Sequence, residues 1–307
     1  MRAVENIAAS NKIDVILPVA LDATAFIAKH ATRLARLAAL HPVPDANTIE
    51  TCRDKCLFAQ FAAKHAIPTP QTVSFIGNAR DDLGVFERGT PVLLKPRISS
   101  NGRGIISFAD KREAELFLDS HPELRSQFVA QPRFAGQDFG CNVLCLHGNI
   151  VAYTIQKAVF RPRQPFGVAA GIEILHNDEV LEISRHLLRA LRYHGVANID
   201  LRYDQRERRI KVLELNARYW GTLLGSLFAG VNFPYLSCMA ALGQPIDSPE
   251  YRHIQYFSAW GLGQQWLGAL RGIDWPPRSP AASVFRYFCA DPLPDLMSPF
   301  LRRPPPP

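Results

Sequence analysis

The strongest alternation of apolar and polar positions in the chain lies in the run 195–221. Ile199 and Leu201 fall on one face of an extended strand, whereas Asp200 and Arg202 fall on the other. A charged stretch follows, and a second alternating run comes after it. The pattern predicts two antiparallel strands joined by a turn, with one apolar face and one polar face.

The polar face of this predicted hairpin gathers oxygen donors. If the turn closes at Asp204 and Ile210, Asp200 lies opposite Glu214, and facing carboxylates repel each other. A divalent cation between them removes that repulsion, and Mg²⁺ prefers carboxylate and carbonyl oxygens. Asp200, Glu214 and the Asn216 amide therefore form a candidate metal site. An ordinary hairpin with solvated acids is the alternative that this stretch leaves open.

Elsewhere, helical spacing of apolar residues alternates with short extended runs. It predicts helices over 23–40, 49–65, 81–88, 111–118, 179–193 and 235–242. Extended runs predict strands over 14–20, 71–76, 91–95, 105–108, 140–146 and 150–155. The single strand 14–20 cannot bury both faces of a sheet between two helices alone. The segment 1–50 therefore either packs on the rest of the chain or is completed by upstream strands of a longer natural protein.

The predicted strand 91–95 ends on Lys95 and is followed by a loop of small residues. Small polar residues and glycines let backbone N–H groups approach an anion closely, and Lys95 adds a mobile positive charge. The combination suits a nucleotide triphosphate, although the Gly-Lys-Ser/Thr of a Walker A loop is absent. The alternative is a flexible hairpin with a surface lysine. The loop residues concerned are Ser99, Ser100, Gly102 and Gly104.

Composition narrows the class of protein. The chain has 307 residues, 47% of them hydrophobic and 21% charged, which is typical of a globular protein of two or three packed units. A formal charge of +7 suits a nucleotide or a nucleic acid, but the basic residues are scattered. The six cysteines lack zinc-ligand spacing, which favours free thiols in a reducing cytoplasm. No apolar run is long enough to predict a transmembrane helix.

Taken together, the motifs resemble the ATP-grasp superfamily, which includes biotin carboxylase and D-alanine–D-alanine ligase. Glu214-Leu-Asn216-Ala-Arg218 is similar to the Glu-x-Asn-x-Arg motif of that family, and Asp200 matches its upstream metal-ligand position. The resemblance implies that Asp200, Glu214 and Asn216 bind Mg²⁺ or Mn²⁺. It also implies catalytic roles for Arg218 and Lys95 during phosphoryl transfer.

The same resemblance implies an ATP site between two lobes. The residues that match nucleotide-contacting positions of the family are Lys55, Lys95, Ser99, Ser100, Gly102, Gly104, Gln131, Phe134 and Asp138. Two of them depart from the usual pattern. Gln131 stands where Glu is frequent in the hinge beside adenine, and Asp138 is one carbon shorter than the Glu that usually binds ribose.

The implied fold is α/β (α+β), with two α+β lobes that grip ATP and an incomplete α/β segment before them. We expect a partial N-terminal segment over 1–50 and a first lobe with the phosphate lid over 51–130. A second lobe with the metal site follows over 131–244, and a cap with a proline-rich tail over 245–307. The short N-terminal segment raises the question of whether this chain is active alone.

The implied function is an ATP-dependent, ADP-forming ligase in the cytoplasm. It would activate a small-molecule carboxylate as an acyl phosphate for attack by an amine. Arg161 and Arg163 are candidates for substrate contact, with a solvated basic loop as their alternative. A small-molecule kinase of the same fold and a non-catalytic ATP-binding module stay open, as does a homodimer. No nucleic-acid motif or membrane segment supports a partner of either kind.

Overall fold

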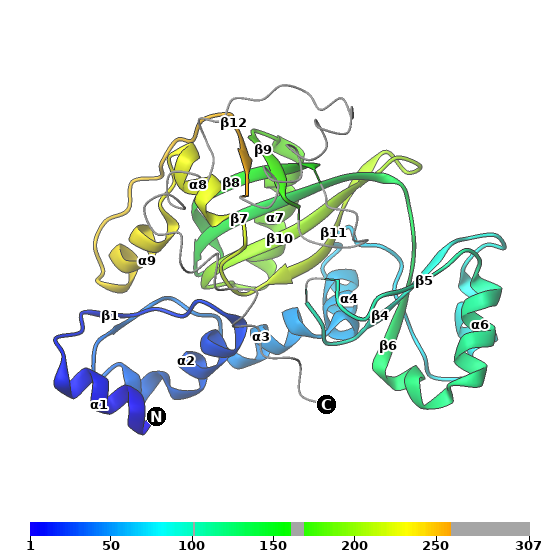
Figure 1. Ribbon diagram of the computed structural model, residues 1–307, viewed down its shortest axis with the longest axis horizontal. Helices are drawn as coiled ribbons and strands as arrows, with labels where there is room; N and C mark the ends of the chain where they lie inside the picture. The colour runs from blue at the N-terminus through cyan, green and yellow to red at the C-terminus, as the bar shows by residue number, and fades with distance from the viewer. Residues whose placement is uncertain (101, 161–168, 259–307) are drawn as a thin grey trace, which may run out of the picture.

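The computed structural model describes residues 1–100, 102–160 and 169–258. Arg161, Arg163 and most of the predicted cap and tail lie outside these ranges. Figure 1 shows a large sheet with its helices, a smaller sheet beside it, and an N-terminal segment below. The cleft between the two sheets positions the candidate site.

The large sheet has six antiparallel strands in the order β11-β10-β7-β8-β9-β12. Their bounds are β7 (Gly136–Leu146), β8 (Asn149–Phe160), β9 (Gly171–Leu175), β10 (Gly195–Asp204), β11 (Arg209–Asn216) and β12 (Ile254–Phe257). β10 and β11 form the hairpin that the alternation predicts. Ile199 and Leu201 are fully buried in the core, against helix α7 (Asp178–Ala190), while Asp200 and Arg202 face the cleft.

Helices α8 (Leu223–Ala229) and α9 (Phe233–Ala241) cover part of the other face of this sheet. Ala229 and Phe233 pack there with Leu144 and Val196, so this part of the sheet is apolar on both faces. No single helix in the described ranges is long and apolar enough to cross a membrane. The α8–α9 pair reaches the required length and hydropathy only together, across a bend of 90°.

The smaller sheet has the order β3-β6-β4-β5 and is antiparallel throughout. Its strands are β3 (Val73–Ser74), β4 (Val92–Pro96), β5 (Ile106–Phe108) and β6 (Phe128–Pro132). Helix α6 (Lys111–Ser120) supplies Ala114 and Leu118 to its core. The predicted helix 81–88 is instead α5 (Ala79–Asp82) followed directly by the 3₁₀ segment η1 (Leu83–Val85). A second 3₁₀ segment, η2 (Pro122–Gln127), connects α6 to β6.

The predicted helix 49–65 is two helices, α3 (Ala46–Arg53) and α4 (Lys55–Lys64), which meet at Asp54. Asp54 is extended, and its carboxylate accepts from the backbone N–H groups of Cys56 and Leu57, which begins α4. Arg97 pairs with the same carboxylate at 2.6 Å. Burial of Asp54 opposes its ionisation, but Arg97 and the two N–H donors outweigh burial and lower the pKa.

The N-terminal segment contains α1 (Arg2–Ser10), β1 (Val15–Ile16), α2 (Leu21–Leu34) and β2 (Ala39–Leu40). β2 falls inside the predicted helix 23–40 and pairs in parallel with β1, so the prediction of a single strand is wrong. The Ala39 and His41 N–H groups donate to carbonyls of Asp14 and Ile16, and this tertiary pairing overrides helical spacing.

Gly195 shows how the segment contacts the large sheet. Its φ of +130° suits glycine, and a Cβ there would lie 2.5 Å from the Pro42 carbonyl oxygen.

The five cysteines of the described ranges are free thiols, as the spacing predicts: Cys52, Cys56, Cys141, Cys145 and Cys238. Strands β6, β9 and β12 have no counterpart among the predicted strands.

Candidate functional site

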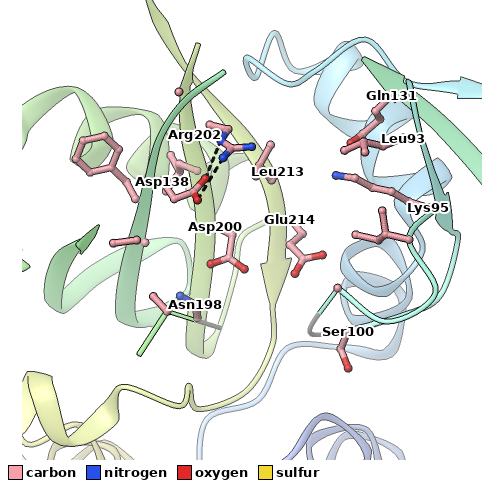
Figure 2. A pocket seen from close by; sticks show the side chains of 18 of the residues that line it. Leu93, Lys95, Ser100, Gln131, Asp138, Asn198, Asp200, Arg202, Leu213 and Glu214 are labelled. Carbon is pink, nitrogen blue, oxygen red and sulfur yellow. Dashed lines mark hydrogen bonds and ion pairs between the residues drawn. The ribbon is translucent and has the colours of Figure 1, made fainter. Parts of the chain in front are cut away.

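A cavity of about 770 Å³ lies between the two sheets. Figure 2 shows that Leu93, Lys95 and Gln131 approach it from the smaller sheet, whereas Asp200 and Glu214 approach from the large one. Since opposite walls come from different sheets, a ligand in the cavity would contact both lobes at once.

The large sheet brings Asp200 and Glu214 directly opposite each other, as the sequence predicts. The turn, however, closes at Asp204 and Arg209 rather than at Asp204 and Ile210. A one-residue register shift between Asp200 and Leu201 restores the expected pair. This β-bulge contains Leu213 as the extra residue, and Leu213 joins Glu214 in lining the cavity.

The Asn216 amide lies between the two acids. Its Nδ2 donates to Asp200 Oδ2 and to Glu214 Oε1, each at 3.2 Å. In a cation-bound protein the amide could present its oxygen here, giving three hard oxygen donors at one point. That donor set fits Mg²⁺ or Mn²⁺. Within the described ranges, no group of three or more His, Cys, Asp and Glu residues offers another cation site.

Two lysines face these acids from different elements. Lys55, the first residue of α4, lies 3.8 Å from Glu214 and donates to the Ser99 carbonyl and hydroxyl. Lys95 lies on β4, and burial lowers its pKa to about 8, with Glu214 opposing the shift and Lys55 adding to it. A desolvated cation that has no hydrogen bond to another described residue is costly alone, so the site favours an anion beside Lys95.

The predicted phosphate lid follows β4. Ser99, Ser100 and Gly102 line the cavity, whereas Gly104 does not. Gly104 has a φ of +74°, and a Cβ there would lie 2.8 Å from a ring carbon of Pro96. Its role in the structure is therefore the turn that returns the chain to β5.

The hinge residues line the other end of the cavity. The Gln131 side chain donates to the hydroxyl of Thr72, the residue before β3, at 2.8 Å. Asp138 lies 2.8 Å from the Arg202 guanidinium, and that guanidinium lies 5.9 Å from the centre of the Phe134 ring. The predicted adenine and ribose residues thus lie together, with Arg202 among them.

Arg218 lies two residues beyond the end of β11, so the turn rather than strand alternation sets the direction of its side chain. It nevertheless lines the main cavity and an adjoining one of about 330 Å³. Its guanidinium donates to the Tyr219 carbonyl at 2.9 Å and to Asn216 Oδ1 at 3.4 Å. The turn after β11 therefore holds Arg218 beside the acids.

Several lining residues were not predicted from the sequence. Asn198 and Arg202 flank Asp200 at alternate positions of β10, so the same alternation could have identified both. Gln156 and Thr222 come from β8 and from the residue before α8, and no local pattern connects them to the hairpin.

Comparisons with known proteins agree with this geometry. Residues 125–259 match the family model described as "ATP-grasp in the biosynthetic pathway with Ter operon". A probable alpha-L-glutamate ligase of Cellvibrio japonicus is 30% identical over 158 residues, 48% of this chain and 50% of that protein. The chain thus spans half the length of this curated relative.

Two solved structures share the fold at low sequence identity. Biotin carboxylase from Campylobacter jejuni has a TM-score of 0.64 and 15% identity, over 80% of this chain and 58% of that one. L-amino acid ligase from Bacillus licheniformis has a TM-score of 0.60 and 21% identity, over 83% of this chain and 63% of that one. At such identities the likeness concerns the fold alone.

Proposed function

Since the chain is a member of the ATP-grasp superfamily by fold and by its family model, we propose that it is an ATP-dependent, ADP-forming ligase. It would join a small-molecule carboxylate to an amine. The observation that carries this proposal is the meeting of paired acids, two lysines and Arg218 around one cavity. The probable glutamate ligase and the L-amino acid ligase support the reaction class.

The walls of the cavity suggest how ATP binds. Adenine and ribose would lie near Gln131, Phe134 and Asp138, where the lining is partly apolar. The phosphates would extend along β10 towards Asp200, with Lys55 and Lys95 beside them. The lid residues Ser99, Ser100 and Gly102 would donate backbone N–H groups to the phosphate oxygens.

Asp200, Glu214 and Asn216 would hold Mg²⁺ or Mn²⁺, which when bound neutralises phosphate charge and orients the triphosphate. The residues of this chain then position the reactants. Lys55 and Lys95 would hold the ground-state triphosphate. Arg218 would contact the γ-phosphoryl group as its charge changes during transfer, and would orient the carboxylate bidentately.

The chemistry has two steps. A substrate carboxylate oxygen attacks the γ-phosphorus, the bond to the β–γ bridging oxygen breaks, and ADP leaves. The product is an acyl phosphate. An amine nitrogen then attacks the acyl carbon, phosphate leaves, and the amine loses a proton as the amide forms.

Hydroxamate formation tests the proposal. When hydroxylamine replaces the amine, it converts an acyl phosphate into a hydroxamate, which can be measured directly alongside ADP release. We expect hydroxamate formation to need ATP, a divalent cation and a carboxylic acid from a panel of amino acids and dipeptides. It should stop when EDTA is added and in Glu214→Ala. Glu182→Ala is the matched control, because Glu182 is exposed on α7 and pairs with Arg185.

Two results would contradict the ligase. ADP release that needs only an alcohol cosubstrate, without hydroxamate, would indicate a kinase. ATP binding without turnover for any acid would indicate a non-catalytic nucleotide-binding module.

A further inference from the structure

Beside the paired acids, a hydrogen-bonded network of neutral side chains crosses the large sheet. Asn198 pairs in register with Asn142, and Asn142 with Thr154, across β10, β7 and β8. In the neighbouring register position Asp200 pairs with Gly140, and Gly140 with Gln156. Neutral hydrogen-bonding groups thus adjoin the candidate metal site directly.

The hydrogen bonds of this network run in one direction. Asn198 Nδ2 donates to Asn142 Oδ1 at 3.0 Å, and Asn142 Nδ2 donates to Gln156 Oε1 at 3.2 Å and to the Thr154 hydroxyl at 3.3 Å. The Thr222 hydroxyl also donates to Gln156 Oε1, at 2.7 Å. Since Gln156 Oε1 receives two donors, the orientation of its amide is fixed by its neighbours.

Two polar atoms at the cavity end of this network can still form hydrogen bonds with a ligand. Among the described residues, Gln156 Nε2 has no hydrogen-bond acceptor and Asn198 Oδ1 has no hydrogen-bond donor, and both residues line the cavity. Gly140 leaves room for the two amides, because a Cβ there would lie 3.0 Å from Gln156 Nε2 and 3.4 Å from Asn198 Nδ2. The cavity therefore presents one donor and one acceptor side by side.

The position along β10 relates this pair to the reaction. Arg202, Asp200 and Asn198 occupy alternate positions, each roughly 7 Å from the next. Arg202 lies at the predicted ribose end and Asp200 at the metal, so Asn198 lies beyond the metal, where the phosphoryl acceptor would bind. Gly140 and Thr222 adjoin the two amides and do not ionise, whereas Asp200 is the next residue on the same face of β10.

We propose that Gln156 and Asn198 bind an amide group of the carboxylate substrate. Gln156 Nε2 would donate to the C=O of that amide, and Asn198 Oδ1 would accept from its N–H. The substrate class is a small carboxylic acid that carries a carboxamide or peptide amide. The inference rests on the proposed ligase function, because that function places the acceptor at this end of the cavity. A carboxylate at the same place would lie beside Asp200 and would find no cation in Gly140 or Thr222, so it would be disfavoured.

Matched pairs of probes test the inference: succinamate with succinate, and L-asparagine with L-aspartate. Binding is measured by calorimetry on the full chain with Mg–ADP, without need of turnover. We expect the amide of at least one pair to bind about tenfold or more tightly than its acid. Gln156→Glu keeps the acceptor oxygen but loses the donor, so it should weaken amide binding about tenfold.

Thr222→Val is a second variant, because it removes one of the two bonds that orient Gln156 and should reduce the amide preference without replacing the amide. Ser226→Ala is the matched control. It removes the 2.9 Å hydrogen bond between the Ser226 and Thr154 hydroxyls, at the end of the network away from the cavity, and should leave the amide preference unchanged. Thermal melts identify any variant that does not fold.

The results separate the two proposals. Absence of binding by both amides, equal binding of amide and acid, or an unchanged preference in folded Gln156→Glu and Thr222→Val would overturn the inference. Selective amide binding with no hydroxamate formed from any acid would uphold the subsite and contradict the ligase.

Discussion

Replacing Lys95 with methionine should make the protein more stable and at the same time weaken its binding of ATP. Lys95 is on β4, and burial lowers its pKa from an ordinary value of 10.5 to about 8. Methionine keeps an unbranched side chain of similar length and removes the buried charge. Opposite effects on stability and affinity distinguish a ligand-binding lysine from one that supports packing.

The size of the stability effect follows from the pKa shift. A group whose folded-state pKa is lowered from 10.5 to about 8 destabilises the folded protein by about 3 kcal/mol at pH 7, because each unit corresponds to about 1.4 kcal/mol. This penalty is fully present below pH 8, where both states carry the proton. It is relieved as pH rises from about 8 towards 10.5, where only the unfolded state keeps the proton.

Thermal melts at pH 7 and pH 9.5 measure this effect. We expect Lys95→Met to melt on the order of 5 to 10 °C above the wild type at pH 7, with a smaller difference at pH 9.5. Lys64→Met is the control, because Lys64 is exposed at the end of α4. It should show neither the gain nor its pH dependence.

Nucleotide titration measures the second effect. Loss of a charged contact to phosphate should raise the Kd for Mg–ATP about 10- to 100-fold. Wild-type affinity should also fall above pH 8, as free Lys95 loses its proton, and Lys95→Met should lose that pH dependence. A variant that binds ATP normally, or that is less stable than the wild type at pH 7, would refute the reasoning.

Other substitutions separate the remaining roles. Arg218→Ala should keep Mg–ATP affinity within a few-fold and lose hydroxamate formation on the order of a hundredfold, whereas Glu214→Ala should lose both; normal turnover in Arg218→Ala would exclude its role. Asp54→Asn keeps an acceptor for the start of α4 but loses an ion pair, so unfolding should become easier by about 1–3 kcal/mol in denaturant titrations; an unchanged midpoint would argue against the pair. Gly140→Ala should displace Gln156 and weaken binding of the amide probes in calorimetry while Mg–ATP affinity is unchanged; equal loss of both would indicate general damage.

The sequence predicted the parts of the site that one local pattern could carry. The fold class and the recognition of an ATP-grasp chain are confirmed. The pairing of Asp200 with Glu214 is also confirmed, although the predicted turn was wrong. The bulge at Leu213 could not be predicted, because its position depends on how two strands pair rather than on their own alternation.

Other features depended on distant contacts. Helical spacing continues through Asp54, so the break there became visible only with its carboxylate bound to Arg97 and to the first turn of α4. The amide chain through Gln156 joins three strands, and strand alternation alone does not show which polar residues meet across a sheet. The roles of the site residues in binding and catalysis stay predictions.

The bulge at Leu213 separates the register of the turn from the register of the acids. In a regular hairpin, a one-residue slip would move every side chain of one strand to the opposite face. Here the shift between Asp200 and Leu201 already absorbs one such offset before the acids are reached. We therefore expect a peptide tag inserted in the stretch 205–208 to leave Asp200 and Glu214 facing each other.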